Sequence, residues 1–535
     1  MKPAWLEHYS PGVPATIDAH AAASLAEVID KACARFADRP AYSQGGTTLS
    51  YAEFDAHARH FAAWLQQVSD LKPGDRIALM MPNLLAYPVA LAGALRAGLV
   101  VVNVNPMYTA RELLHQLKDS GATVIVAVEA TLPLVRQVRE AGGLRRVIAV
   151  AMTDLQREQA PGAAALEHGE DRFTQLLAVG AGLDFDAPRI GRDHLAFLQY
   201  TGGTTGVSKG AMLTHGNIVA NLQQGAAWYG SALGEGAVAV TAIPLYHIFG
   251  LTFNCLVMIQ AGALNRLVAN PRDPAQLFAA LAPGFTILSG VNTLFNGLLN
   301  APEIEGVDFS TLKLAVSGGA STQAAVAERW LRVTGCRIGE GYGLTETSPF
   351  ALANAMHAGF GGGLLPFPST QVAIRNEAGV ELPVGDVGEI CIRGPQVMRG
   401  YWQQPAETAA VLDADGWLRT GDVGHMDARG AVTVTDRKKD MVLVSGFNVF
   451  PNEVEAVLAA HPKVLECAVI GVPDPTSGEA LKAFVVARDA GLTAEALIEH
   501  CRASLTAYKV PRQFAFTDQL PKSPVGKILR RSLRA

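Results

Sequence analysis

The sequence lacks the signatures of several common classes of protein. Its six cysteines form neither a CxxC pair nor the spacing of a zinc site, so free thiols in a reducing compartment are expected instead of a disulfide framework. The HExxH motif of metalloproteases does not occur. A basic excess is also missing: the 535 residues carry a net charge of −5, which gives no support for a nucleic-acid partner.

Long uninterrupted apolar runs are missing too. The two most apolar stretches, 84–104 and 238–264, are broken by Pro88 and Pro244, respectively, and by polar residues before about 20 apolar residues accumulate. The first residues contain no apolar core of a signal peptide. We therefore expect a cytoplasmic protein. Peripheral contact with the inner face of a membrane, and a homodimer, stay open.

What is present is a globular composition, with 49% hydrophobic and 17% charged residues. Apolar segments and capping signals between residues 76 and 128 predict a strand, a helix, a strand, a helix and a strand in turn. These elements are expected at 76–81, 84–97, 99–104, 109–119 and 122–128. This order is typical of a mostly parallel α/β sheet covered on both faces.

The texture of the sequence changes twice further along. Between about 371 and 435, short alternating segments separated by Gly and Asp turns predict a small antiparallel β unit. A charged run at 436–440 then precedes a compact α+β pattern at 441–535. We predict a large N-terminal domain over 1–435, a hinge at 436–440 and a small mobile C-terminal domain.

The segment from Tyr200 to Lys209 reads Tyr-Thr-Gly-Gly-Thr-Thr-Gly-Val-Ser-Lys and follows an apolar run that predicts a buried strand. Glycines allow close backbone approach, and successive N–H groups can bind an anion, so a phosphate loop at the carboxyl end of a parallel sheet is expected. Lys209 follows Gly206 by three residues, and this register excludes a Walker A loop. A flexible surface loop is the alternative. The candidate residues are Thr201, Gly202, Gly203, Thr204, Thr205, Gly206 and Lys209.

The segment 340–348, Glu-Gly-Tyr-Gly-Leu-Thr-Glu-Thr-Ser, combines glycines with groups suited to a nucleotide. Its glycines allow close approach, its tyrosine can stack on a base, and its hydroxyl and carboxylate oxygens suit Mg²⁺ beside phosphates. An ordinary glycine-rich turn with a helix cap is the alternative. The candidates are Gly341, Tyr342, Gly343, Thr345 and Glu346, together with Ser317, Gly318, Gly319 and Ala320 at the end of another predicted strand.

Three isolated residues complete the set of candidates. Asp422, beside a glycine turn, can accept both hydroxyls of a ribose, or can be a hairpin turn residue. Lys527, in Pro-Lys-Ser-Pro-Val-Gly-Lys, can bring positive charge to a carboxylate or phosphate, or can belong to a solvated basic tail. His247, among aromatic residues and glycine, can contact a substrate carboxylate or can be a core histidine.

Taken in this order, the motifs resemble the adenylate-forming superfamily of acyl-CoA synthetases, firefly-type luciferases and peptide-synthetase adenylation domains. The resemblance spans the chain from Leu49 to Lys527. Within the superfamily the chain looks most like bacterial long-chain fatty acid–CoA ligases, since 415–440, 444–455 and 522–531 are similar to their motifs. Arg419 stands where the fatty acyl-CoA synthetase signature often has His.

The resemblance implies a two-step reaction with ATP, Mg²⁺ and coenzyme A. A fatty carboxylate would attack the α-phosphate to give acyl-AMP and pyrophosphate. The thiol of coenzyme A would then attack acyl-AMP and release acyl-CoA and AMP. The implied roles are phosphate contacts for Thr201–Lys209 and Thr345, adenine contacts for Ser317–Ala320 and Tyr342, Mg²⁺ for Glu346, ribose for Asp422 with Arg437 beside it, the hinge for Asp436, the first step for Lys527 and the pantetheine tunnel for Ser445, Gly446 and Phe447.

Alternatives to this function stay open at the level of substrate. A medium-chain, aryl or other carboxylic acid is the runner-up, because sequence motifs do not fix the shape of an acyl pocket. A fatty acyl-AMP ligase is a third option. Such ligases usually carry an insertion near the small β unit, and none is evident in this sequence. A non-catalytic nucleotide- or acyl-binding module is disfavoured by the complete set of site residues.

Overall fold

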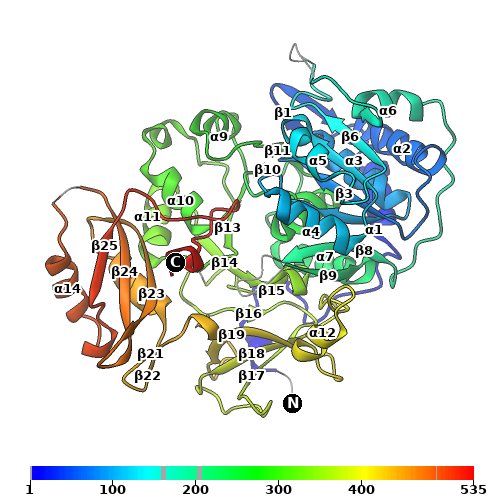
Figure 1. The fold of residues 1–535 in the computed structure, drawn as a ribbon. Helices are drawn as coiled ribbons and strands as arrows, with labels where there is room; N and C mark the ends of the chain where they lie inside the picture. The colour runs from blue at the N-terminus through cyan, green and yellow to red at the C-terminus, as the bar shows by residue number, and fades with distance from the viewer. Residues whose placement is uncertain (1–2, 158–163, 202–207, 359, 490, 535) are drawn as a thin grey trace.

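The computed structural model describes residues 3–157, 164–201, 208–358, 360–489 and 491–534. Four sheets account for the strands of these residues. Two large sheets lie side by side in the N-terminal part, a small antiparallel sheet lies below them, and the C-terminal sheet stands at one side (Figure 1). The α/β fold class is confirmed.

The first large sheet holds the predicted β-α-β-α-β unit. Its strand order is β7 (Glu170–Arg172), β6 (Arg146–Val150), β5 (Val124–Val128), β3 (Arg76–Met80), β4 (Val100–Asn103), β8 (Leu195–Thr201) and β9 (Lys209–Thr214). Every pair is parallel except β8–β9. The segment carrying the glycine-rich motif thus connects an inner parallel strand to an antiparallel edge strand.

The second large sheet has nine strands. Their order is β16 (Leu365–Pro366), β15 (Phe350–Ala353), β14 (Ile338–Gly343), β13 (Leu314–Gly318), β12 (Ile287–Gly290), β10 (Val238–Thr241), β11 (Leu264–Leu267), β1 (Pro40–Gln44) and β2 (Thr47–Ser50). The inner strands are parallel, so their carboxyl ends meet along one edge. That edge is where ligands bind in open α/β sheets.

Helices cover these two sheets. They are α1 (Leu25–Arg35), α2 (Tyr51–Gln67), α3 (Ala86–Arg96), α4 (Ala110–Ser120), α5 (Leu132–Val138), α6 (Phe173–Gly180), α7 (His215–Tyr229), α8 (Met258–Ala261), α9 (Pro274–Leu281), α10 (Asn292–Asn300) and α11 (Ala324–Thr334). The predicted capping box of Thr109 and Glu112 starts α4, and Gly121 ends it in the left-handed conformation. Helix α3 is buried on all sides, which explains its uninterrupted apolar sequence.

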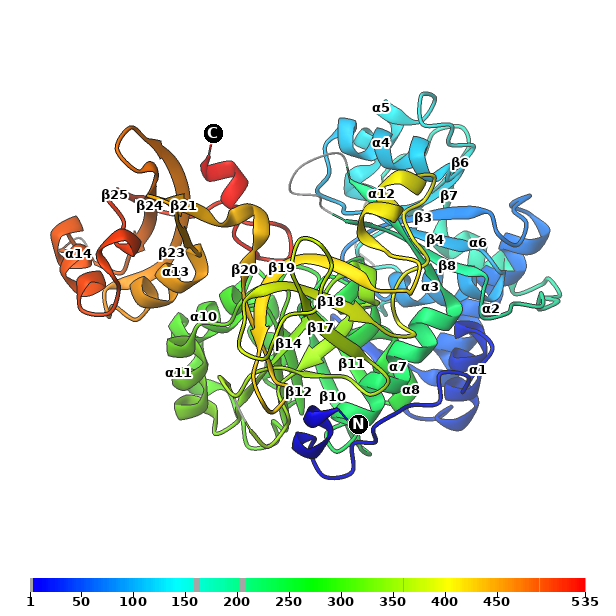
Figure 2. The same ribbon diagram turned by 90° about the horizontal axis from the view of Figure 1, so that it is seen from below.

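The small antiparallel sheet consists of β17 (Gln371–Arg375), β18 (Gly388–Arg393), β19 (Leu418–Met426) and β20 (Val432–Arg437), with α12 (Pro405–Val411) inserted before β19. Seen from below, this sheet lies across the large domain (Figure 2). The short η6 (Lys438–Asp440) follows β20 and leads into the C-terminal sheet.

The C-terminal sheet contains β22 (Phe447–Val449), β21 (Val442–Val444), β24 (Gly478–Ala487), β23 (Val464–Asp474) and β25 (Gln513–Phe516). It is packed with α13 (Pro451–Ala459) and α14 (Ala494–Arg502) around its own apolar cluster. Helix α13 begins with proline at its first position, and α14 is capped by the Thr493 side chain.

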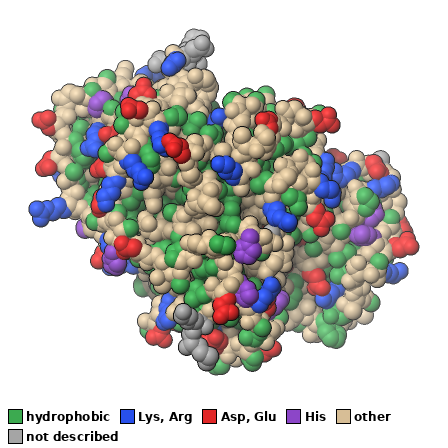
Figure 3. Space-filling model, turned by 180° about the vertical axis from the view of Figure 1, so that it is seen from behind, with side chains coloured by type: hydrophobic (Ala, Val, Ile, Leu, Met, Phe, Trp, Pro, Cys, Tyr) green, Lys and Arg blue, Asp and Glu red, His purple; other side chains and the backbone are tan. Residues whose placement is uncertain are grey.

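The surface agrees with the near-balanced charge of the sequence. Basic and acidic side chains are interspersed on the face seen from behind (Figure 3). No helix among the described residues is long and apolar enough to cross a membrane.

Candidate active site

The carboxyl ends of β13 and β14 form one wall of the candidate site. In this parallel pair Ser317 is opposite Glu340 and Gly318 is opposite Gly341. Ser317 is fully buried, and its hydroxyl accepts a hydrogen bond from the Thr322 hydroxyl at 2.8 Å. The two glycine-bearing segments predicted to frame an adenine are therefore adjacent.

Tyr342 and Asp422 bring the small antiparallel sheet against this wall. The Tyr342 hydroxyl donates to the Asp422 carboxylate at 2.7 Å, and the Arg437 guanidinium lies 3.4 Å from the other carboxylate oxygen. Asp422 and Arg437 are register partners on β19 and β20, which explains their pairing. Burial, with the Asp422 charge, holds the pKa of Tyr342 well above its ordinary value, so its hydroxyl stays a donor.

Lys527 reaches this site from the C-terminal domain. Its loop is held by the Thr293 hydroxyl at the start of α10, which donates to the Gly526 carbonyl at 2.9 Å. Burial lowers the pKa of Lys527 to about 8, the Arg437 charge adds to this effect, and Asp422 opposes it. The structure therefore docks the loop that carries Lys527 against the start of α10 in the large domain.

His247 is the predicted site residue that belongs to the large domain near β10. It lies in a turn after β10, where its backbone N–H donates to the Pro244 carbonyl at 3.1 Å, just before the π-helix η3 (Gly250–Val257). π-Helical turns are frequent at functional sites. Burial, reinforced by the charge of Lys527, lowers the pKa of His247 to about 4, so its imidazole is neutral at pH 7.

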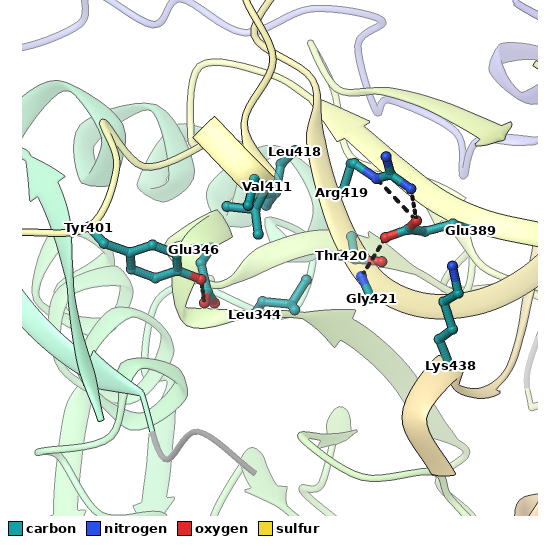
Figure 4. Close-up of a pocket in the computed structure, with 11 residues that line it drawn as sticks. Leu344, Glu346, Glu389, Tyr401, Val411, Leu418, Arg419, Thr420, Gly421 and Lys438 are labelled. Atoms are coloured by element: carbon teal, nitrogen blue, oxygen red, sulfur yellow. Dashed lines mark hydrogen bonds and ion pairs between the residues drawn. The ribbon is translucent and has the colours of Figure 1, made fainter. Parts of the chain in front are cut away.

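A second cluster surrounds Glu346 in the short helix η5 (Thr345–Thr347). The Tyr401 hydroxyl donates to the Glu346 carboxylate at 2.7 Å, and the Lys209 ammonium lies 4.6 Å from the centre of the Tyr401 ring. Lys209 also forms an ion pair with Glu407 of α12 at 2.6 Å. The start of β9 and the carboxylate predicted to bind Mg²⁺ are thus linked through one tyrosine. Figure 4 shows the Tyr401 hydroxyl pointing at the Glu346 carboxylate.

Two cavities lie beside these groups. Glu346 and Tyr401 line one of about 310 Å³, together with Glu389 and Arg419. Asp422 and Arg437 line another of about 280 Å³. Thr420, Gly421 and Lys438 belong to both linings, so the two spaces share a boundary on β19 and η6.

The residues around Glu346 fit a magnesium ion that arrives with a nucleotide. Among the described residues no group of three or more His, Cys, Asp or Glu is arranged to hold a metal. Mg²⁺ in nucleotide sites uses one or two carboxylates and completes its octahedron with phosphate and water. A single carboxylate, beside the Thr345 hydroxyl and a cavity, suits that mode of binding.

Some predicted residues lie elsewhere or cannot be placed. Gly202, Gly203, Thr204, Thr205 and Gly206 lie outside the described residues, although Thr201 ends β8 and Lys209 begins β9. The Ser445–Phe447 turn joins β21 to β22 on the C-terminal domain, and Phe447 there is 55% exposed and stacks on Tyr508. The structure therefore leaves this turn exposed on the C-terminal domain.

Asp436, predicted as the hinge, is buried within β20 opposite Val423. Its carboxylate accepts from the backbone N–H of Asn452 at 2.8 Å and from the Arg530 guanidinium at 3.0 Å. Arg530 also pairs with Glu455 of α13 at 2.7 Å. The junction between the last strand of the small sheet and the C-terminal domain is thus an ion network.

Sequence reasoning missed three groups of this site. Tyr401, Glu389 and Arg530 are not in the predicted set. Tyr401 contacts Glu346, Arg530 contacts Asp436, and Glu389 contacts the backbone of Gly421 next to Asp422. Glu389 holds Arg419 at 2.7 Å and accepts from the Gly421 N–H at 3.1 Å (Figure 4). Each contact joins segments far apart in sequence, so spacing carries no signal for it.

Comparison with known proteins agrees with this fold and site. The family model of the AMP-binding enzyme matches residues 29–402, and that of the AMP-binding enzyme C-terminal domain matches 453–527. The chain belongs to the family of AMP-binding enzymes, which are adenylate-forming.

Individual relatives are similar over the whole chain. A long-chain-fatty-acid–CoA ligase of Salmonella typhimurium is 49% identical, with 100% of this chain and 98% of the relative covered. One of Haemophilus influenzae is 45% identical with the same coverage. The crystal structure of ATP-bound MatB from Rhodopseudomonas palustris is 30% identical and superimposes with a TM-score of 0.83, covering 95% of this chain and 98% of that one.

Proposed function

We propose that this chain ligates a fatty acid, with a preference for long chains, to coenzyme A through an acyl-adenylate. ATP is the nucleotide substrate, and Mg²⁺ and coenzyme A complete the reaction. The proposal rests on membership of the family, on full-length similarity to long-chain-fatty-acid–CoA ligases, and on the arrangement of the site.

The site residues divide the work of the first step. Attack of a carboxylate on a phosphate brings two anions together, so positive charge is needed where negative charge develops. Lys527 would hold the carboxylate and the α-phosphate, while Tyr342 and Asp422 orient the adenosine. Mg²⁺ at Glu346 would neutralise phosphate charge when bound. Neutral His247 would shape the carboxylate end of the acyl pocket without adding a second cation.

One observation supports the proposal: the loop that carries Lys527 is held against the large domain, where the Thr293 hydroxyl donates to the Gly526 carbonyl at 2.9 Å and the Arg272 guanidinium donates to the Ser523 carbonyl at 3.3 Å. The effects of the Asp422 charge on the pKa of Lys527 and of the Lys527 charge on the pKa of His247 agree with this placement. The same orientation leaves the Ser445–Phe447 turn in solvent. We therefore assign the described orientation to the adenylation step, with 1–435 and 441–535 as the two domains.

A series of acids tests the substrate assignment. Purified protein with ATP, Mg²⁺ and coenzyme A is given saturated acids from about C6 to C18, and acyl-CoA and AMP are measured. We expect turnover to rise toward the longer acids. Turnover that stops above about C10, or that is higher with aryl acids, would replace the long-chain assignment by the runner-up.

The same assay addresses location. ATP and coenzyme A are water-soluble, whereas a long-chain acid partitions into lipid, so we propose a cytoplasmic enzyme that meets its acid at the inner face of a membrane. Presenting the acids in phospholipid vesicles and measuring co-sedimentation of the protein tests this. Protein that stays wholly in the supernatant while turnover is undiminished would exclude contact with the membrane.

A further inference from the structure

Tyr401 contacts both Glu346 and Lys209, two residues of the candidate phosphate site. It lies in a segment that pairs with β9: the Met212 N–H donates to the Gly400 carbonyl at 2.8 Å, and the Trp402 N–H donates to the Gly210 carbonyl at 2.8 Å. The Trp402 indole also donates to the Asp119 carbonyl at 3.0 Å. Backbone pairing on both sides of Tyr401 therefore fixes the direction in which its side chain points.

The hydroxyl of Tyr401 is committed to Glu346. It lies 2.7 Å from one carboxylate oxygen, and Tyr401 is only 7% exposed, so water competes poorly for this bond. Within the described parts of the chain, no other hydrogen bond restrains this carboxylate, and Glu346 lines the adjoining cavity.

The ring of Tyr401 contacts the Lys209 ammonium. The ammonium lies 4.6 Å from the ring centre, within the range of a cation–π interaction. Glu407 holds the same ammonium from the other side at 2.6 Å. One side chain thus positions an anion through its hydroxyl and a cation through its face, and these are the groups predicted to meet Mg²⁺ and the terminal phosphates.

We propose that Tyr401 is a positioning residue for the reaction: it fixes the Glu346 carboxylate for the magnesium ion of Mg·ATP and holds Lys209 beside it. The inference rests on the proposed function through the role of Glu346. A carboxylate fixed before the ion arrives loses less freedom on binding, so the tyrosine hydroxyl raises affinity for the metal complex without touching the reacting atoms.

Tyr401→Phe separates the two contacts, because it removes the hydroxyl and keeps the ring over Lys209. We expect the Mg²⁺ concentration that gives half-maximal adenylation to rise about tenfold, as for loss of a hydrogen bond to a charged group. At saturating Mg²⁺, kcat and the KM for the acid should stay near wild type. In Tyr401→Ala, which also removes the ring, ATP binding in the presence of a chelator should weaken as well.

A binding measurement without turnover accompanies the kinetics. Calorimetric titration of ATP, with Mg²⁺ and with chelator, should show that Tyr401→Phe loses affinity only for the Mg²⁺ form. Trp402→Phe is the matched control, since it removes the hydrogen bond to Asp119 from the next residue and does not contact Glu346. It should leave the dependence on Mg²⁺ unchanged.

Two outcomes would overturn the inference: a dependence on Mg²⁺ in Tyr401→Phe equal to wild type, or an equal shift in Trp402→Phe. A separate outcome bears on the proposed function. If the wild-type protein itself binds ATP no better with Mg²⁺ and forms no acyl-adenylate, the assigned reaction fails, and the role of Tyr401 in it fails for that reason rather than through the variant.

Discussion

The surroundings of Lys527 disfavour the charged form of its ammonium group. Burial and the neighbouring Arg437 lower its pKa to about 8 from an ordinary value of 10.5. In the proposed role the protonated form would neutralise phosphate, and it predominates only below that pKa. We therefore predict that kcat/KM for adenylation, measured by ATP–pyrophosphate exchange, falls as pH rises through about 8.

Lys527→Arg is the matched variant for this profile. An arginine keeps its charge at every pH of the experiment. Its activity should be lower because the guanidinium is larger, but its alkaline fall near pH 8 should disappear. A wild-type profile that stays flat to pH 10, or a variant that keeps the fall, would assign the alkaline limb to another group.

At the scale of the element, β14 shows why one glycine is required and another is not. A Cβ added at Gly343 would lie 1.7 Å from the Pro349 carbonyl oxygen, whereas at Gly339 on the same strand the nearest atom would be 3.7 Å away. We predict that Gly343→Ala destabilises the protein by about 3 kcal/mol or prevents folding, since backbone must move. Gly339→Ala should change stability little. Equal melting temperatures for the Gly343→Ala and Gly339→Ala variants would contradict this prediction.

The strands of the first large sheet were largely predictable from sequence, and the contacts of the site were not. Predicted segments at 76–81, 99–104 and 122–128 became β3, β4 and β5, because a buried parallel strand is apolar along its whole length. The pairing of Tyr342 with Asp422 joins residues 80 positions apart. Gly343 was predicted to allow close approach of a cofactor. In the structure the Pro349 carbonyl occupies the space that a side chain at Gly343 would need, and no local sequence pattern shows this contact.

At the scale of the whole molecule, the contact of Thr293 with Gly526 offers a way to test whether the C-terminal domain must move between the two half-reactions. A Cβ at Gly526 would lie 2.7 Å from the Thr293 hydroxyl oxygen, so cysteines at both positions are within reach of a disulfide. We predict that oxidised Thr293→Cys/Gly526→Cys retains ATP–pyrophosphate exchange and loses transfer of preformed acyl-AMP to coenzyme A. Reduction should restore the transfer.

The single cysteine variants are the controls for this cross-link, because Gly526 has a φ of +87° and a side chain there is strained even without the bond. They should behave alike with and without reductant. If the oxidised double variant completes both half-reactions, the described orientation serves both, and rotation of the C-terminal domain is unnecessary.

The Ser445–Phe447 turn and Lys527 belong to one folded body, and the turn is in solvent while the lysine is docked. On the roles assigned to them, the two cannot occupy the site together. Because one domain carries both segments, the two half-reactions would have to follow one another. In that case coenzyme A could not use the Ser445–Phe447 turn while Lys527 is docked, and acyl-AMP would react with coenzyme A only after Lys527 has left the site.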